Sequence, residues 1–110
     1  MDQIDRVLTG DMKKEDLPFV MCRTASGGAG VHHGYLVGLS GTCVRLVSSH
    51  RLWSWVGHNT LNEVANHGAP EGSRISVALE HPSGIILPSV CEVIYVTKKA
   101  QESLQRPRWG

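Results

Sequence analysis

The chain has 110 residues, of which 41% are hydrophobic and 19% charged, and its formal net charge is +1 at pH 7. This length is typical of one globular domain, and the near-neutral charge makes nucleic acid an unexpected partner. No apolar run approaches the ~18 residues of a membrane span, and the acidic N-terminus lacks the features of a secretory signal, so we expect a cytosolic protein without a membrane segment.

The N-terminal residues 1–17 are polar and carry charges of both signs. Within them Ile4, Val7 and Leu8 recur at helical spacing, which predicts one or two turns of helix. The proline that follows marks a change of pattern. We therefore divide the chain into a polar, partly helical segment at residues 1–17 and a single small β-rich domain at residues 18–110.

Strands are predicted over most of the second part, because polar and apolar residues alternate there. Ser40-Gly41 favours a short hairpin turn, and the glycine-rich residues 26–30 predict a flexible turn. The expected strands cover residues 19–24, 31–39, 42–48, 50–56, 74–79, 85–87 and 90–96. Residues 50–56 are either a continuation of the preceding strand or a new one, and 85–87 with 90–96 are either one last strand or a bent pair.

Two short helices are expected among these strands. Residues 60–63 have the capping-box spacing of a hydroxyl followed three residues later by Glu, and Gly68 is typical of a helix end. Thr97 can cap a terminal helix over residues 98–104. Hairpin connections without a βαβ unit predict a mainly β fold: a single-domain, antiparallel, barrel-like or strongly curved sheet of five or six strands with two or three short helices.

The three cysteines, Cys22, Cys43 and Cys91, are far apart and each lies among apolar neighbours. An odd number at such spacings does not predict a disulfide framework. We expect all three to be reduced and buried, behaving as small hydrophobic residues.

Sequence patterns of catalytic, metal and cofactor sites are missing. His32 and His33 are adjacent, so in a strand they point to opposite faces and cannot bind one ion together. The glycines within 27–30 lead into a strand, so they lack the helix dipole that holds phosphate. Residues 48–50 are Ser-Ser-His, but no acid is placed to orient the histidine. We therefore expect no enzyme, metal or cofactor.

The most informative stretch contains Arg51, Trp53 and Trp55, which would share one face of a strand. A cation and two indoles on one face can hold a planar aromatic or anionic group by stacking and cation–π attraction. The same pattern fits a packed core with an arginine at its rim, and both interpretations stay open. We expect Trp55 to belong to the core, and Arg51 and Trp53 to lie at the edge of a pocket or interface. With Arg23 and the terminal Trp109, these are the candidate binding residues.

Several of these segments resemble a family of small tailed-phage proteins of unassigned function with an Arg-Thr, Ala-Gly-Val and Arg-x-Trp-x-Trp pattern. Those proteins continue with a short capped helix and end in a terminal Trp. The matching residues are Arg23-Thr24, Ala29-Gly30-Val31 with Gly34, Arg51-Leu52-Trp53-Ser54-Trp55, Gly57, residues 60–65 with Gly68, Ser73-Arg74-Ile75-Ser76, Val93-Ile94 with Thr97, and Trp109. Ser54 departs from the pattern, since the family usually has an aromatic residue there. The resemblance implies a phage gene product in an infected bacterium, and it supplies no activity.

From these observations we expect a non-enzymatic phage accessory protein that acts as a binding protein in the host cytoplasm. The sharpest form is a counter-defence factor that sequesters a host nucleotide signal or blocks a host protein. We also expect a homo-oligomer, because a small curved sheet must protect its edge strands.

Two other functions stay open. The main alternative is a virion component, such as a capsid decoration or tail accessory protein bound to another phage protein. Single-stranded nucleic-acid binding ranks last, because the chain has the tryptophans but few cations for such a surface.

Overall fold

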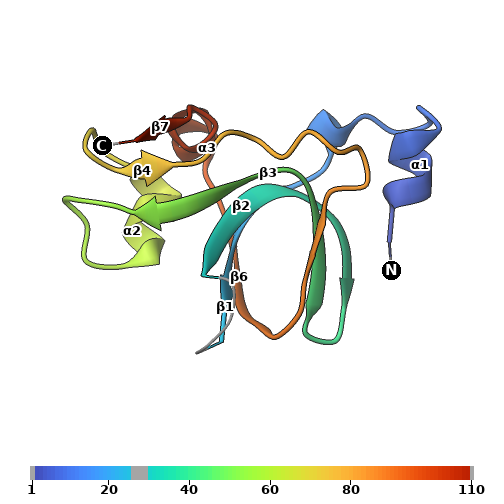
Figure 1. Ribbon diagram of the computed structural model, residues 1–110, viewed down its shortest axis with the longest axis horizontal. Helices are drawn as coiled ribbons and strands as arrows, with labels where there is room; N and C mark the ends of the chain where they lie inside the picture. The colour runs from blue at the N-terminus through green and yellow to red at the C-terminus, as the bar shows by residue number, and fades with distance from the viewer. Residues whose placement is uncertain (1, 26–29, 110) are drawn as a thin grey trace.

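The computed structural model describes residues 2–25 and 30–109. Along the chain these residues form α1 (Ile4–Leu8), a 3-10 turn η1 (Lys14–Asp16), β1 (Phe19–Thr24), β2 (Val31–Ser40), β3 (Cys43–Ser54), α2 (Leu61–His67), β4 (Arg74–Ile75), β5 (Ile85–Leu87), β6 (Val90–Tyr95), α3 (Lys98–Leu104) and β7 (Arg108–Trp109). The protein is therefore mainly β with three short α-helices, and the expected fold class is confirmed (Figure 1).

The strands form one antiparallel sheet in the order β6-β1-β2-β3-β4-β7, while β5 pairs with β3 beside this path. The sheet has seven strands rather than five or six, and it is neither closed nor strongly curled. The sheet stays open because its terminal strands, β6 and β7, do not pair with each other in the described part of the chain: β6 pairs with β1 and β7 with β4. Between β5 and β6, Pro88 lacks an amide proton and Ser89 has a φ of 56°, so the backbone there leaves the extended conformation.

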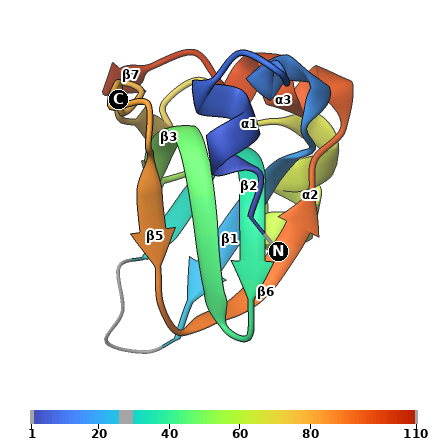
Figure 2. The same cartoon turned by 90° about the vertical axis from the view of Figure 1, so that its right-hand side faces the viewer.

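The hairpin of β2 and β3 is the longest ladder of the sheet, with β2 paired to β1 and β3 to β5. Figure 2 shows the hairpin with β5 on its left and β6 on its right. Ser40 lies opposite Cys43, so the turn is formed by Gly41 and Thr42, one residue later than expected. Gly41 has a φ of 59°, which favours glycine at the first turn position. Of the two alternatives for 42–48 and 50–56, the continuous strand is the one observed: β3 passes through Ser48 with a φ of 50° and ends at Ser54.

Two buried clusters lie on opposite faces of the sheet, because successive residues of β1 alternate between them. The strand cluster contains Val20, Cys22, Val44, Leu46, Leu87 and Val90. The helix cluster contains Phe19, Met21, Tyr35, Val37, Val47, Leu52, Leu61, Val64, Ala65, Ala69, Ile75, Ala100 and Leu104. Since α2 and α3 supply residues to the second cluster, they cover one face of the sheet and leave the other face to the strands.

Both predicted helices are confirmed, together with their caps. The hydroxyl of Thr60 accepts a hydrogen bond from the backbone N–H of Glu63 at 3.4 Å, and α2 ends at Gly68 with a φ of 89°. The hydroxyl of Thr97 accepts one from the backbone N–H of Ala100 at 3.1 Å. Figure 1 shows these two helices at the same end of the molecule as β4 and β7, with α1 at the other end. None of the described helices is long and apolar enough to cross a membrane.

The N-terminal segment is attached to the β2–β3 hairpin. The backbone N–H of Gln3 donates to the carbonyl of Val37 at 2.8 Å, and the carboxylate of Asp2 pairs with Arg45 at 2.8 Å. Gly30, the last residue of the expected turn at residues 26–30, has a φ of 87°. The rest of that turn, including Ala29, lies outside the described residues.

The prediction of three buried cysteines is wrong for two of them. Cys22 is buried in the strand cluster, but Cys43 and Cys91 are exposed. Alternation along β3 and β6 places the neighbouring residues Val44 and Val90 in the interior, so the two thiols point outward.

Candidate functional site

The five candidate residues from the sequence lie in two places. Arg51, Trp53 and Trp109 are connected by ring contacts on one exposed part of the sheet. Arg23 and Trp55 line a hollow beside α2. The single Arg51, Trp53 and Trp55 face expected from alternation is therefore not formed.

Trp55 departs from that face because β3 ends at Ser54. Its indole packs against the helix cluster, and its Nε1 donates to the carbonyl of His58 at 3.2 Å. Trp53, by contrast, is 51% exposed although the preceding Leu52 is buried in the helix cluster. The strand thus places Trp53 on the face that the helices leave uncovered.

On this face Arg51, Trp53, Arg74 and Trp109 form what we call the Arg–Trp surface. The guanidinium carbon of Arg51 lies 3.7 Å from the ring centroid of Trp53, within cation–π range. The indoles of Trp53 and Trp109 meet edge to face, with centroids 5.8 Å apart and an interplanar angle of 76°. The guanidinium carbon of Arg74 lies 5.4 Å from the ring of Trp109. Two exposed indoles in contact with each other therefore lie between two arginines, of which Arg74 is exposed and Arg51 half-buried.

Strand pairing brings the terminal tryptophan to this surface. β7 pairs with β4 so that Trp109 lies opposite Arg74, and β4 pairs with β3 so that Arg74 lies opposite Ser54. The sequence did not indicate Arg74, because this contact depends on the register of two-residue strands far apart in the chain. Only the alternation of Arg74 with the buried Ile75 could have suggested an exposed arginine.

Arg108 holds β7 in place from the other side of the strand. Its guanidinium donates to the carbonyls of Ser103 at 3.0 Å and Arg106 at 2.8 Å, and also to the carbonyl of Ala69. Burial lowers the pKa of Arg108, followed by repulsion from Arg106. This arginine therefore anchors the terminal strand instead of joining the exposed surface.

A hollow of about 430 Å³, here called the Arg51 hollow, lies next to the Arg–Trp surface. It forms where residues 76–80 run alongside β3: the backbone N–H of Ser76 donates to Arg51 O at 3.0 Å, and that of Leu79 donates to Ser49 O at 2.8 Å. Val77, Leu79 and Ile85 are among its apolar lining residues, while Arg51, Ser49 and Ser76 are among the polar ones. Arg51 is thus common to the hollow and the Arg–Trp surface.

Two stacked histidines lie beside the Arg51 hollow. Nδ1 of His50 is 2.8 Å from the carbonyl of Ser76, and since a carbonyl only accepts, this nitrogen carries the proton. The ring of His50 stacks on His33 with centroids 5.3 Å apart. His33 is fully buried, and both of its ring nitrogens lack a hydrogen-bond partner in the described part of the chain. Burial lowers the pKa of both imidazoles, so both are neutral at pH 7.

The second place holding candidate residues, the Trp55 hollow, has a volume of about 380 Å³. Arg23 of β1 and Glu92 of β6 form an ion pair at 2.7 Å on one side of it. Trp55, Asn59 and Asn62 line it from the loop after β3 and from the start of α2. Its chemistry differs from the Arg–Trp surface, because here the one arginine is neutralised by a carboxylate.

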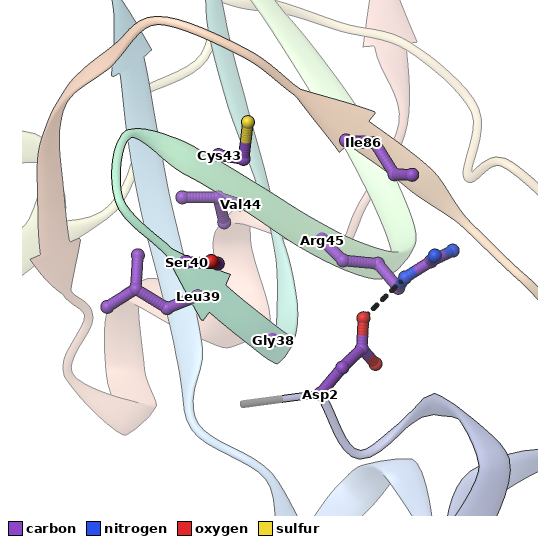
Figure 3. A pocket seen from close by; sticks show the side chains of 8 residues that line it. All are labelled: Asp2, Gly38, Leu39, Ser40, Cys43, Val44, Arg45 and Ile86. Atoms are coloured by element: carbon purple, nitrogen blue, oxygen red, sulfur yellow. Dashed lines mark hydrogen bonds and ion pairs between the residues drawn. The ribbon is translucent and has the colours of Figure 1, made fainter.

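A third hollow of about 220 Å³ lies at the free end of the β2–β3 hairpin. Figure 3 shows Asp2 and Arg45 joined by their ion pair on one side, with Cys43, Leu39 and Ile86 around the opening. It contains none of the candidate residues. Among the residues described by the structure, no three His, Cys, Asp or Glu side chains are grouped so that they could hold a metal ion.

The fold and its exposed sites define a small antiparallel β protein with short helices on one face of its sheet. A family model described as "Domain of unknown function (DUF6948)" matches residues 18–104. The chain belongs to this family. No curated protein and no solved structure shows significant similarity to the chain.

Proposed function

We propose that the protein is a non-enzymatic binding protein that holds a planar, anionic ligand of the nucleotide class on the exposed face of its sheet. The observation that carries this proposal is the position of Arg51, which lies 3.7 Å from the ring centroid of Trp53 and also lines the Arg51 hollow. The volume of about 430 Å³ falls within the roughly 300–1,000 Å³ of small-molecule sites.

The lining of the Arg51 hollow supports such a ligand chemically. A guanidinium stays charged at all physiological pH values and can donate two parallel hydrogen bonds to a phosphate. The hydroxyl group of Ser49 can donate to a further oxygen, while Val77 and Leu79 offer apolar walls to a base. Arg74, beside Trp109, places a second cation on the same surface.

The biological role that we propose is counter-defence in a bacterium infected by a tailed phage. The support is the resemblance of the Arg-x-Trp-x-Trp segment to small tailed-phage proteins. A protein that binds a nucleotide signal without turning it over would act by sequestering it in the host cytoplasm.

The binding proposal can be tested by titrating the purified protein with nucleoside monophosphates, nucleoside diphosphates and cyclic dinucleotides, followed by calorimetry and tryptophan fluorescence. We expect one class to bind, and Arg51→Ala to weaken its binding by about tenfold or more, because a charge-assisted hydrogen bond is lost. Arg106→Ala is the matched control, since this exposed arginine pairs with Glu71 at 3.1 Å. No binding by the wild type, or equal affinity in Arg51→Ala, would contradict the proposal.

A second candidate function, the blocking of a host protein, is favoured by the exposure of Trp53 and Trp109, at 51% and 60%. Tryptophan and arginine are enriched among the residues that dominate protein interfaces. In infected cells that need this protein, Trp109→Ala should abolish protection while leaving nucleotide binding intact if a host protein is the target. If Arg51→Ala loses both nucleotide binding and protection while Trp109→Ala still protects, a nucleotide is favoured as the target.

We further propose that the protein forms a homo-oligomer. β6 and β7 are the terminal strands of the described sheet, and an open strand edge is satisfied by pairing with another copy. Light scattering at tens of micromolar checks this, and a monomer mass there would contradict it.

A further inference from the structure

The Trp55 hollow is built by elements that the proposed nucleotide site does not use. β1, β6, the loop after β3 and the start of α2 each supply part of its lining. We propose that this hollow is a second binding site, and that it takes a neutral carbohydrate: a sugar ring with free hydroxyl groups.

The indole of Trp55 is fixed before any ligand arrives. Its body packs against the helix cluster, and Gly57, with a φ of 77°, turns the chain after it. The single polar atom of the ring, Nε1, already donates to the carbonyl of His58. What the ring can still offer to a ligand is therefore apolar surface, which suits the C–H groups of a sugar ring.

Polar groups that both donate and accept line the same hollow as this indole. Asn59 and Asn62 line the hollow, and their carboxamides make no hydrogen bond within the described residues. Each carboxamide has one acceptor oxygen and two donor hydrogens, so a pair of them can bind hydroxyl groups in either direction. These two carboxamides match a ligand whose own groups both donate and accept hydrogen bonds.

The charge of the hollow selects against ions. Arg23 and Glu92 are the charged residues that line it, and their ion pair of 2.7 Å leaves a neutral lining. A phosphate drawn to Arg23 would meet the carboxylate of Glu92, and an ammonium group drawn to Glu92 would meet Arg23. A hydroxyl group can accept from the guanidinium and donate to the carboxylate at once, so neighbouring hydroxyls of a neutral sugar fit both partners.

The experiment is saturation-transfer NMR on the full chain with glucose, galactose, N-acetylglucosamine, rhamnose and short oligomers of each, followed by titration. We expect at least one sugar to bind weakly, with its ring C–H protons receiving the strongest transfer. Asn62→Ala should weaken binding roughly two- to tenfold, since one neutral hydrogen bond is lost. Trp55→Phe, which keeps an aromatic ring but removes the bond to His58, should weaken it as well.

Asn66→Ala is the matched control, because Asn66 is exposed on the same helix and does not line the hollow. Arg51→Ala should also leave sugar binding unchanged, which separates this site from the proposed nucleotide site. Absence of transfer from every sugar of the panel would overturn the proposal. Equal binding by the wild type and both Asn62→Ala and Trp55→Phe, or displacement of the sugar by nucleosides alone, would overturn it too.

Discussion

The two faces of the sheet at β3 and β4 differ sharply, although the same strands form both. Leu52 and Ile75, at 3% and 1% exposure, lie under α2 and α3. Trp53, the next residue after Leu52, is 51% exposed on the opposite face. The smaller Leu52 is thus buried in the helix cluster while the larger Trp53 is exposed, because burial depends on which face of the sheet the helices cover.

This difference separates the residues that stabilise the fold from those of the proposed binding surface. The helix-covered face contributes to folding through buried apolar area. On the other face, Arg51 and Trp109 contact the indole of Trp53, and such exposed contacts contribute only ~0.5–1 kcal/mol each. The exposed face can therefore change with little loss of stability, which suits a binding surface.

The largest expected effect is a difference in reaction rate between buried and exposed cysteines of the sheet. Cys22 is buried in β1, and burial raises its pKa to about 12, whereas Cys43 and Cys91 are exposed. A buried thiol reacts only when the structure opens, so we expect Cys22 to react at least about a thousandfold more slowly than the other two. Labelling under native conditions, followed by peptide mass spectrometry, measures the three rates. Similar rates for all three would show that β1 is not buried on both faces.

A pair of alanine substitutions tests the two faces directly. Ile75→Ala removes a fully buried side chain from the helix cluster and should lower the free energy of unfolding by about 2–5 kcal/mol. Trp53→Ala, on the opposite face of the sheet, should lower it by no more than about 1 kcal/mol. Urea unfolding of both variants provides the measurement. A loss at Trp53 as large as that at Ile75 would assign the tryptophan to the core and remove the basis of the Arg–Trp surface.

Local patterns were sufficient for much of this architecture. Alternation placed β1, β2 and β6, and the hydroxyl residues Thr60 and Thr97 located both capped helices, because these features depend on neighbours in the sequence. The strand expected over 74–79 is only two residues long, since after Ile75 the chain continues as the irregular segment beside β3. The alternation of polar and apolar residues over 74–79 did not show that strand pairing stops after Ile75.

The candidate site was predicted in part, for the same reason. Alternation placed Arg51 beside Trp53, a local relation, but it also included Trp55, because the end of β3 at Ser54 has no sequence marker. Arg74 and Trp109 meet through long-range register, which one sequence does not reveal. The outward direction of Cys43 and Cys91 likewise depended on which neighbour fills the strand cluster.

The smallest expected effect concerns His33, a buried polar residue on the helix-covered face of the sheet. Its ring lies between Phe19, with centroids 5.9 Å apart, and His50. Burial lowers its pKa most, and the neighbouring His50, His32 and Arg108 lower it further. In the unfolded chain the imidazole has its ordinary pKa of about 6.5. Below that pH the unfolded chain therefore binds a proton that the folded protein does not, and the fold loses up to about 1.4 kcal/mol per pH unit from this group.

Replacing His33 with an apolar residue should remove two destabilising contributions: the burial of unpartnered ring nitrogens and the loss of stability at acidic pH. We expect His33→Leu to raise the free energy of unfolding at pH 7 by about 1 kcal/mol, because two unpartnered buried nitrogens disappear, and to flatten its decline between pH 6.5 and 4.5. His67→Gln serves as the control, since this histidine is exposed and the change should alter neither property. Urea unfolding across this pH range measures both. A wild-type decline that persists unchanged in His33→Leu would show that another group carries the acid sensitivity, and a destabilised variant at pH 7 would show that the imidazole has a partner in the folded protein.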